Sequence, residues 1–251
     1  MNNDIILSAS NLSKSFNGLK VVHGVDLEIK RGSVHALIGP NGAGKTTLFN
    51  LLTRFLPATS GTISFQGNDI SSAKSADVAR LGMVRSFQIS AVFSHLSVLE
   101  NVRVALQRKR TDAMYFWRSD KCLTALNESA MTLVSAVGLE SFSDSLAVEL
   151  SYGRKRALEI ATTLALDPTL MLLDEPTAGM GQEDIERTVA LIRHVSSNRT
   201  ILMVEHNLGV VRALSDEVTV LARGKVLARG DYDSVADNPL VAKAYLGVRH
   251  A

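Results

Sequence analysis

The sequence predicts an α/β fold in which a largely parallel sheet is covered by helices and interrupted by a helical insertion. Two runs, Met171–Leu173 and Ile201–Val204, are apolar on both faces, as is typical of strands that lie between layers of helices. Short apolar runs also alternate with turn residues in the first third of the chain. From about Val98 to Val137 the apolar spacing becomes helical, which places the insertion in the middle.

Local signals extend this prediction along the chain. Ser97 and Glu100 have the spacing of a capping box, and Gly138 stands where a helix would stop. Strands are expected at Lys20–Leu27, Val34–Ile38, Gly61–Phe65, Thr169–Leu173, Thr200–Val204, Val218–Leu221 and Lys225–Ala228. Helices are expected at Thr46–Leu56, Gly153–Leu166 and Gln182–Val195.

The composition excludes several classes of protein. The chain has 251 residues, 46% hydrophobic and 21% charged, close to the average of globular domains. The net charge is only +2 and no basic stripe is present, so nucleic acid is not an expected partner. The single cysteine cannot form an internal disulfide, and the N-terminus lacks a secretory pattern. No apolar run approaches the ~18 residues that span a bilayer, so a soluble intracellular chain is expected.

A glycine-rich loop between a strand and a helix gives the strongest functional signal. It matches the phosphate-binding pattern G-x-x-x-x-G-K-[ST]. Glycines let backbone N–H groups surround phosphate oxygens, and the helix N-terminus adds partial positive charge. The lysine is expected to contact the terminal phosphates of a nucleotide, and the threonine after it to bind Mg²⁺. The loop consists of Gly39, Pro40, Asn41, Gly42, Ala43, Gly44, Lys45, Thr46 and Thr47.

Two adjacent carboxylates follow the apolar strand that ends at Leu173. Ligands of open α/β sheets bind at the C-terminal edge of the strands, where these side chains are expected. Asp174 is expected to hold Mg²⁺ through water, and Glu175 to polarise the attacking water as a general base. The following proline ends the ladder of the strand.

The stretch Leu150–Ala161, LSYGRKRALEIA, resembles the signature motif of ATP-binding-cassette (ABC) proteins. The usual form is Leu-Ser-Gly-Gly-Gln, from which Tyr152 and Arg154 depart. Ser151 at a helix start, with Gly153 nearby, still offers a hydroxyl and N–H groups to a phosphate. A further departure follows the acidic pair, where Gly181 replaces the aspartate of many cassettes.

The resemblance covers the whole chain and implies an ABC ATPase fold. Such a fold has a RecA-like P-loop NTPase core, an N-terminal antiparallel β subdomain and a helical insertion. A single ABC ATP-binding domain is therefore expected over residues 1–251. Residues 1–88 and about 150–251 would form the nucleotide-binding core, and about 89–150 the helical subdomain.

The same resemblance implies the rest of the site. Phe16 matches the aromatic residue that stacks on adenine, and His206 the switch histidine that contacts the γ-phosphate. Gln88 matches the glutamine that joins the core to the insertion and approaches the metal. Catalysis would thus depend on Glu175, His206, Lys45 and Gln88, with ATP and Mg²⁺ as cofactors. A second, identical or paralogous ATP-binding subunit would pair head to tail, so that Ser151 and Gly153 of one chain contact ATP held by the other.

Three features are similar to the ATP-binding subunits of branched-chain amino-acid importers: Val84–Gln88, the Tyr-Gly form of the signature, and the ending Asn238–Gly247. The implied partners are transmembrane permeases and, indirectly, a solute-binding protein, at the cytoplasmic face of the inner membrane of a bacterial-type cell. Lipopolysaccharide-export cassettes share part of this pattern, and related importers carry urea or other small amides and acids. Such export cassettes usually lack the Arg-x-Phe-Gln form that stands at Arg85–Gln88, so the resemblance favours an importer of branched-chain or related amino acids and keeps the others as alternatives.

Two other classes compete with a transporter ATPase. Soluble cassettes that act on DNA or ribosomes usually carry two cassettes or a long coiled-coil insertion, for which this chain is too short. A nucleotide-binding regulator without turnover would not need Glu175 and His206, and both are present. The sequence therefore favours the transporter ATPase.

Overall fold

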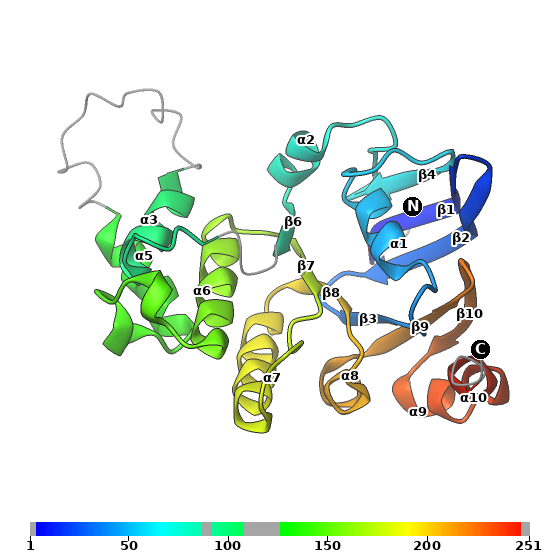
Figure 1. The fold of residues 1–251 in the computed structure, drawn as a ribbon. Coiled ribbons are helices and arrows are strands. Elements are labelled where there is room, and N and C mark those ends of the chain that lie inside the picture. The colour runs from blue at the N-terminus through cyan, green and yellow to red at the C-terminus, as the bar shows by residue number, and fades with distance from the viewer. Residues whose placement is uncertain (1–3, 87–91, 108–125, 247–251) are drawn as a thin grey trace.

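The computed structural model describes residues 4–86, 92–107 and 126–246. Two sheets lie side by side, and a group of helices extends from the edge of the parallel sheet (Figure 1). Within the described residues, no helix is both long enough and apolar enough to cross a membrane. The α/β fold with a helical insertion that the sequence predicts is confirmed.

The larger sheet has the strand order β10-β9-β3-β8-β7-β6. All neighbouring strands in it run parallel except β10 and β9. In β7, Leu170 and Leu172 pack into one core, and Met171 and Leu173 pack into the core on the opposite face. The strands are β3 (Val34–Ile38), β6 (Met83–Ser86), β7 (Leu170–Asp174), β8 (Thr200–Val204), β9 (Glu217–Ala222) and β10 (Lys225–Gly230).

The smaller sheet is antiparallel and has the order β2-β1-β4-β5. Helix α1 (Lys45–Leu52) packs between the two sheets, because Leu48, Phe49, Leu51 and Leu52 belong to the core that both sheets share. The sequence predicts this helix four residues too long, to Leu56. The strands are β1 (Ile5–Phe16), β2 (Leu19–Lys30), β4 (Ser60–Phe65) and β5 (Asn68–Asp69). This sheet is the antiparallel part that the family resemblance implies.

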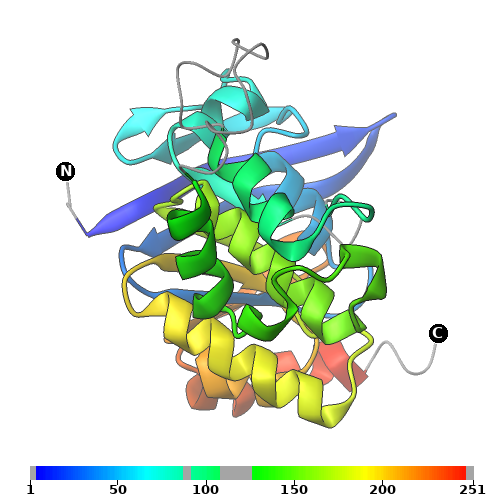
Figure 2. The same cartoon turned by 90° about the vertical axis from the view of Figure 1, so that its left-hand side faces the viewer.

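A group of helices lies beyond the β6 edge and faces the viewer in Figure 2. The expected capping box is present, because Ser97 N–H donates to Glu100 Oε2 at 2.7 Å and Glu100 N–H donates to Ser97 Oγ at 3.2 Å. Gly138, with φ 70°, ends the next helix as expected, and Leu139 N–H closes it with a bond to Val134 O at 3.0 Å. The group comprises α3 (Val98–Gln107), α5 (Asn127–Ala136), η2 (Glu140–Phe142), η3 (Ala147–Glu149) and α6 (Tyr152–Ala165).

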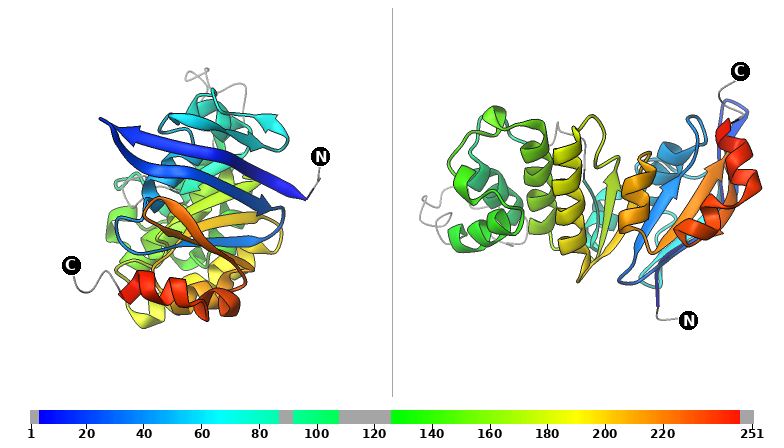
Figure 3. Two further views of the ribbon diagram at one scale, coloured as in Figure 1. Left: turned by 90° about the vertical axis from the view of Figure 1, so that its right-hand side faces the viewer. Right: turned by 90° about the horizontal axis from the view of Figure 1, so that it is seen from below.

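The remaining helices cover the parallel sheet and its ends. Helix α7 (Gln182–Ser196) lies beside α6 and α8 (Leu208–Leu214), as the view from below shows (Figure 3). Helices α9 (Tyr232–Ala236) and α10 (Pro239–Leu246) pack near β10, and α2 (Ser75–Arg80) precedes β6. The short helices α2, α8, α9 and α10 were not anticipated from the sequence.

His35 lies fully buried on β3 between the strands of the parallel sheet. Its Nε2 is 2.8 Å from Thr219 Oγ1 on β9, and within the described residues its Nδ1 has no hydrogen-bond partner. Burial lowers the pKa of His35 from 6.5 to about 4, against the opposing effect of Glu217. The folded protein therefore holds this imidazole neutral.

We expect the stability of the protein to fall as the pH drops from about 6.5 to 4. An unfolded His35 binds a proton near its ordinary pKa, whereas the folded residue resists protonation down to about 4. The shift corresponds to roughly 3 kcal/mol, present above pH 6.5 and lost through this window. Urea unfolding of wild type and His35→Gln at pH 7.5 and 4.5 measures it. An equal difference between the two proteins at both pH values would exclude His35 as the cause.

Candidate nucleotide-binding site

The glycine-rich loop joins the end of β3 to the start of α1. Gly39 has φ 150°, and a Cβ built there would lie 2.0 Å from the backbone oxygen of Leu221 on β9. Gly42 and Gly44 have φ 76° and 99°, which lies in the range that favours glycine. The loop can therefore pass this closely along the sheet only with glycine at Gly39.

Lys45 is the first residue of α1 and is only 6% exposed. Its Nζ donates to the carbonyl oxygens of Gly39 at 2.8 Å and Pro40 at 3.1 Å, so the ammonium group is held inside the loop. Burial lowers the pKa of Lys45, and Glu175 and Asp174 oppose that shift. The charge of Lys45 is thus directed at the space that the loop encloses.

A cleft of about 370 Å³ opens beside this loop. Val21 on β2 lines the cleft, which the sequence did not indicate. Glu175 and His206 line it from the ends of β7 and β8. The other lining residues belong to the loop and the start of α1: Asn41, Gly42, Ala43, Gly44, Lys45, Thr46 and Thr47.

Glu175 and His206 meet across this cleft. His206 Nε2 lies 2.9 Å from Glu175 Oε1, and both side chains are about two-fifths exposed. Glu175 N–H donates to Val204 O at 2.9 Å, so β8 holds the residue that follows β7. Glu175 has φ 45°, an uncommon conformation for a residue other than glycine. The carboxylate of Glu175 and the imidazole of His206 thus lie together next to the loop.

Asp174 is paired with an arginine, Arg85, to which no motif in the sequence gives a role. The Arg85 guanidinium on β6 forms an ion pair with Asp174 Oδ2, and both side chains are mostly buried. Arg85 Nη1 also donates to Asn50 Oδ1 on α1 at 2.5 Å, and the guanidinium lies 5.5 Å from the Phe49 ring. Arg85 therefore connects the helix behind the loop to the carboxylate at the end of β7.

A second buried arginine reaches the same strand end from α6. Arg156 Nη2 donates to the backbone oxygen of Asp174 at 3.2 Å, and Nη1 donates to Glu159 Oε2 at 2.5 Å. Burial raises the pKa of Glu159, while Arg156 opposes the shift. The helix that begins with the signature stretch is thus attached to the acidic pair. No motif could have revealed this contact, because only the fold brings α6 to β7.

Three of the other expected site residues, Phe16, Ser151 and Gly153, do not line this cleft. Phe16 ends β1 with an exposed ring that has Lys14 Nζ 5.1 Å from its centre, and it does not line the cleft. Ser151 is the N-cap residue of α6, and Gly153 packs beside the Asp184 carboxylate of α7. Gln88 lies outside the described residues.

Comparison with known proteins decides the family. The family described as "ABC transporter" matches residues 22–178. The chain belongs to the ABC transporter family. A second family, described as "Branched-chain amino acid ATP-binding cassette transporter", matches residues 225–251. As an ABC cassette, the chain binds and hydrolyses ATP, the activity that the loop, the acidic pair and the signature stretch predict.

Named relatives of this ABC cassette match over nearly the full chain. The high-affinity branched-chain amino acid transport ATP-binding protein BraF of Pseudomonas aeruginosa is 38% identical over 96% of this chain and 98% of its own length. The corresponding protein LivG of Salmonella typhimurium is 35% identical over 96% and 98%. The ADP conformation of MJ1267, an ATP-binding cassette of an ABC transporter, has a TM-score of 0.83 at 27% identity and covers 97% of this chain and 99% of its own.

We expect Arg85→Met to lower the free energy of unfolding by about 3 kcal/mol, because Asp174 would stay buried without its cation. Arg80→Met is the matched control, since the pair of Arg80 with Asp77 is exposed and such pairs contribute about 0–1 kcal/mol. Urea denaturation of the three proteins measures the difference. Equal losses in both variants would show that the buried pair does not stabilise the site.

Proposed function

We propose that this ABC ATPase hydrolyses ATP in the cleft beside the glycine-rich loop and thereby drives a membrane transporter for branched-chain or related amino acids. The observation that carries the proposal is the 2.9 Å contact of Glu175 with His206 next to buried Lys45. The names of the relatives and the family that matches residues 225–251 support the choice of cargo.

Each residue of the cleft has a proposed role. The backbone of residues 39–47 and the Lys45 ammonium hold the phosphates, because the loop presents N–H groups and one buried cation. Glu175 accepts a proton from the attacking water. His206 contacts both Glu175 and the γ-phosphate and so keeps them correctly placed relative to each other. Gln88, which lies beyond the described residues, is proposed to join the core to the helical part and to approach the metal.

The residues at the loop and at the end of β7 fit Mg²⁺. Mg²⁺ in such sites is held by one or two protein oxygens together with phosphate oxygens, and Thr46 offers a hydroxyl and Asp174 a carboxylate. Arg85 engages Oδ2 of Asp174. Within the described residues no group of three or more His, Cys, Asp or Glu is placed to hold a metal ion. When bound, Mg²⁺ would neutralise charge on the phosphate oxygens.

Two chains are proposed to pair head to tail. Ser151 and Gly153 stand at the N-terminus of α6, a helix of 14 residues whose N–H groups suit a phosphate. Neither residue lines the cleft of its own chain. ATP would then lie between Lys45 of one chain and Ser151 of its partner, with the exposed Phe16 ring available to adenine.

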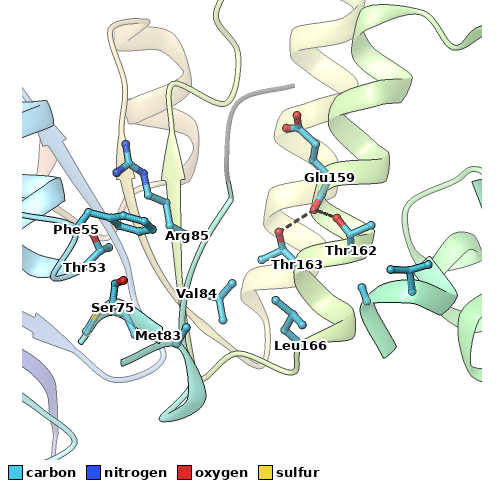
Figure 4. Close-up of a pocket in the computed structure, with 13 residues that line it drawn as sticks. Thr53, Phe55, Ser75, Met83, Val84, Arg85, Glu159, Thr162, Thr163 and Leu166 are labelled. Atoms are coloured by element: carbon cyan, nitrogen blue, oxygen red, sulfur yellow. Dashed lines mark hydrogen bonds between the residues drawn. The ribbon is translucent and has the colours of Figure 1, made fainter. Parts of the chain in front are cut away.

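A groove between the core and the helical group is proposed to receive a permease. Its volume is about 340 Å³, and it is lined by Thr53 and Phe55 after α1 and by α2, β6, α3 and α6, with Val84 and Leu166 among the other apolar residues (Figure 4). Arg85, which holds Asp174, also lines the groove. A segment seated there would therefore lie next to a residue that reaches the metal site.

The proposed assembly sits at the cytoplasmic face of the inner membrane, where the permeases in turn receive cargo from a solute-binding protein. Different parts of the chain are proposed to have different roles. Residues 1–88 and about 150–251 would bind the nucleotide, and about 89–150 would form the helical subdomain that transmits movement to the permease.

We expect Glu175→Gln to slow ATP turnover by ~10²–10⁴, the usual contribution of a general base, while ATP affinity stays unchanged. Phosphate release measures turnover, and a fluorescent ATP analogue measures affinity. Glu28→Gln on the exposed side of β2 is the matched control and should leave both unchanged. Near-normal hydrolysis by Glu175→Gln would remove Glu175 from this role.

The groove is tested through Val104→Glu, which places a charge at a lining residue that is 37% exposed. Val104→Glu, combined with Glu175→Gln and purified with ATP from gently solubilised membranes, should lose its permeases but still bind ATP. Met131→Glu is the matched control, because Met131 on α5 is also 37% exposed but does not line the groove. Retention of the permeases by Val104→Glu would refute the proposal that the groove binds a permease. Recovery of a lipid-export permease pair by the control would refute the amino-acid cargo.

A further inference from the structure

Glu205 stands between β8 and His206 and is a carboxylate that no motif singles out. It is only 3% exposed. One oxygen, Oε2, accepts from the backbone N–H of His206 at 2.6 Å and of Asn207 at 3.0 Å. The other, Oε1, accepts from the backbone N–H of Thr177 at 3.2 Å and from the Thr177 hydroxyl. A single buried side chain therefore connects the turn after β8 with the turn after β7.

These two turns carry the two residues that meet in the cleft. Thr177 follows Glu175 by two residues, and its turn is closed by the bond from Ala178 N–H to Glu175 O at 3.1 Å. On the other side, Asn207 caps α8, since its Oδ1 accepts from Gly209 N–H at 2.9 Å. The backbone on both sides of His206 is thus held, by Glu205 before it and by the helix cap after it.

We propose that Glu205 is the positioning residue that fixes His206 against Glu175 during ATP hydrolysis. The proposal rests on the role of His206 given above. Glu205 is not itself a second base, because its buried oxygens are occupied by N–H and O–H donors, whereas Glu175 lies open to the cleft. The adjacent acid thus acts through the backbone of His206 and does not touch the reacting atoms.

The hydrogen bonds of Glu205 with Thr177, His206 and Asn207, here called the clamp, require a carboxylate. Both oxygens of a carboxylate accept hydrogen bonds, whereas an amide has one accepting oxygen and an NH₂ group that only donates. In Glu205→Gln the NH₂ group would face backbone N–H groups from one turn or the other. Thr177→Val is the milder change, because it removes one hydroxyl from the clamp and keeps the size of the side chain. Thr177→Ser keeps that hydroxyl.

The experiment compares Thr177→Val, Thr177→Ser and Glu205→Gln in the full chain, alone and combined with His206→Ala. Phosphate release gives kcat, and a fluorescent ATP analogue gives nucleotide affinity. We expect Thr177→Val to lower kcat about tenfold, as the loss of a hydrogen bond to a charged group implies, with affinity changed less than twofold. Thr177→Ser should restore turnover, and Glu205→Gln should lose more than Thr177→Val.

The effect of Thr177→Val in the His206→Ala background tests whether the clamp acts through His206. In the His206→Ala background, Thr177→Val should change the remaining turnover less than twofold, because the clamp has nothing left to position. Equal tenfold losses in both backgrounds, or parallel losses of affinity and kcat, would overturn the proposal, and Thr177→Val answers this even where Glu205→Gln does not fold. Full turnover in His206→Ala alone would instead refute the role of the histidine. If His206→Ala strongly lowers turnover but Thr177→Val leaves it unchanged, only the clamp is refuted.

Discussion

The register of three parallel strands is the constraint on which the site depends. Leu37 of β3 lies opposite Val204 of β8, and Asp174 of β7 lies opposite the same residue. The three strands therefore end at the same level of the sheet. The glycine-rich loop follows β3, the acidic pair lies at the end of β7, and His206 follows β8. Because side chains alternate along a strand, a shift of one residue in β7 would exchange its two faces and send Leu172 to the wrong core. The apolar packing of β7 on both faces thus sets the position of Glu175.

The functional groups at this edge are held by contacts with other groups of the protein. Lys45 is bonded to loop carbonyls, Asp174 is paired with Arg85, and Glu175 meets His206. For Lys45 and Asp174, which are mostly buried, these contacts avoid an uncompensated charge that would cost several kcal/mol. The helix that starts with the signature stretch is attached to the same strand end through Arg156, so changes there can reach α6.

The parts of the fold that depend on local pattern could be predicted from the sequence, and those that depend on long-range contacts could not. Strands β7 and β8 are apolar throughout, and the capping box at Ser97 and the stop at Gly138 involve neighbours in the chain. Strand β1 was missed because polar residues interrupt it and its pairing with β2 shifts register repeatedly. The loop and the acidic pair were visible as motifs. Arg85 and Glu205 stand one or a few residues from recognised positions, but their contacts with Asp174 and Thr177 join different elements, and no spacing in the sequence encodes those contacts.

The departures in the signature stretch have a local structural basis. The Arg154 guanidinium lies 3.9 Å from the centre of the Phe142 ring, so the side chain that replaces the usual glutamine stacks on the helical group. Tyr152, in place of glycine, is 43% exposed, and its hydroxyl lies 4.0 Å from the Cβ position of Gly179 in the turn before α7. Gly153 is different, because a Cβ there would lie 2.7 Å from the Asp184 carboxylate, so the side chain of Asp184 on α7 would have to move. The two replaced positions therefore have room for a side chain, whereas at Gly153 a side chain would meet the Asp184 carboxylate.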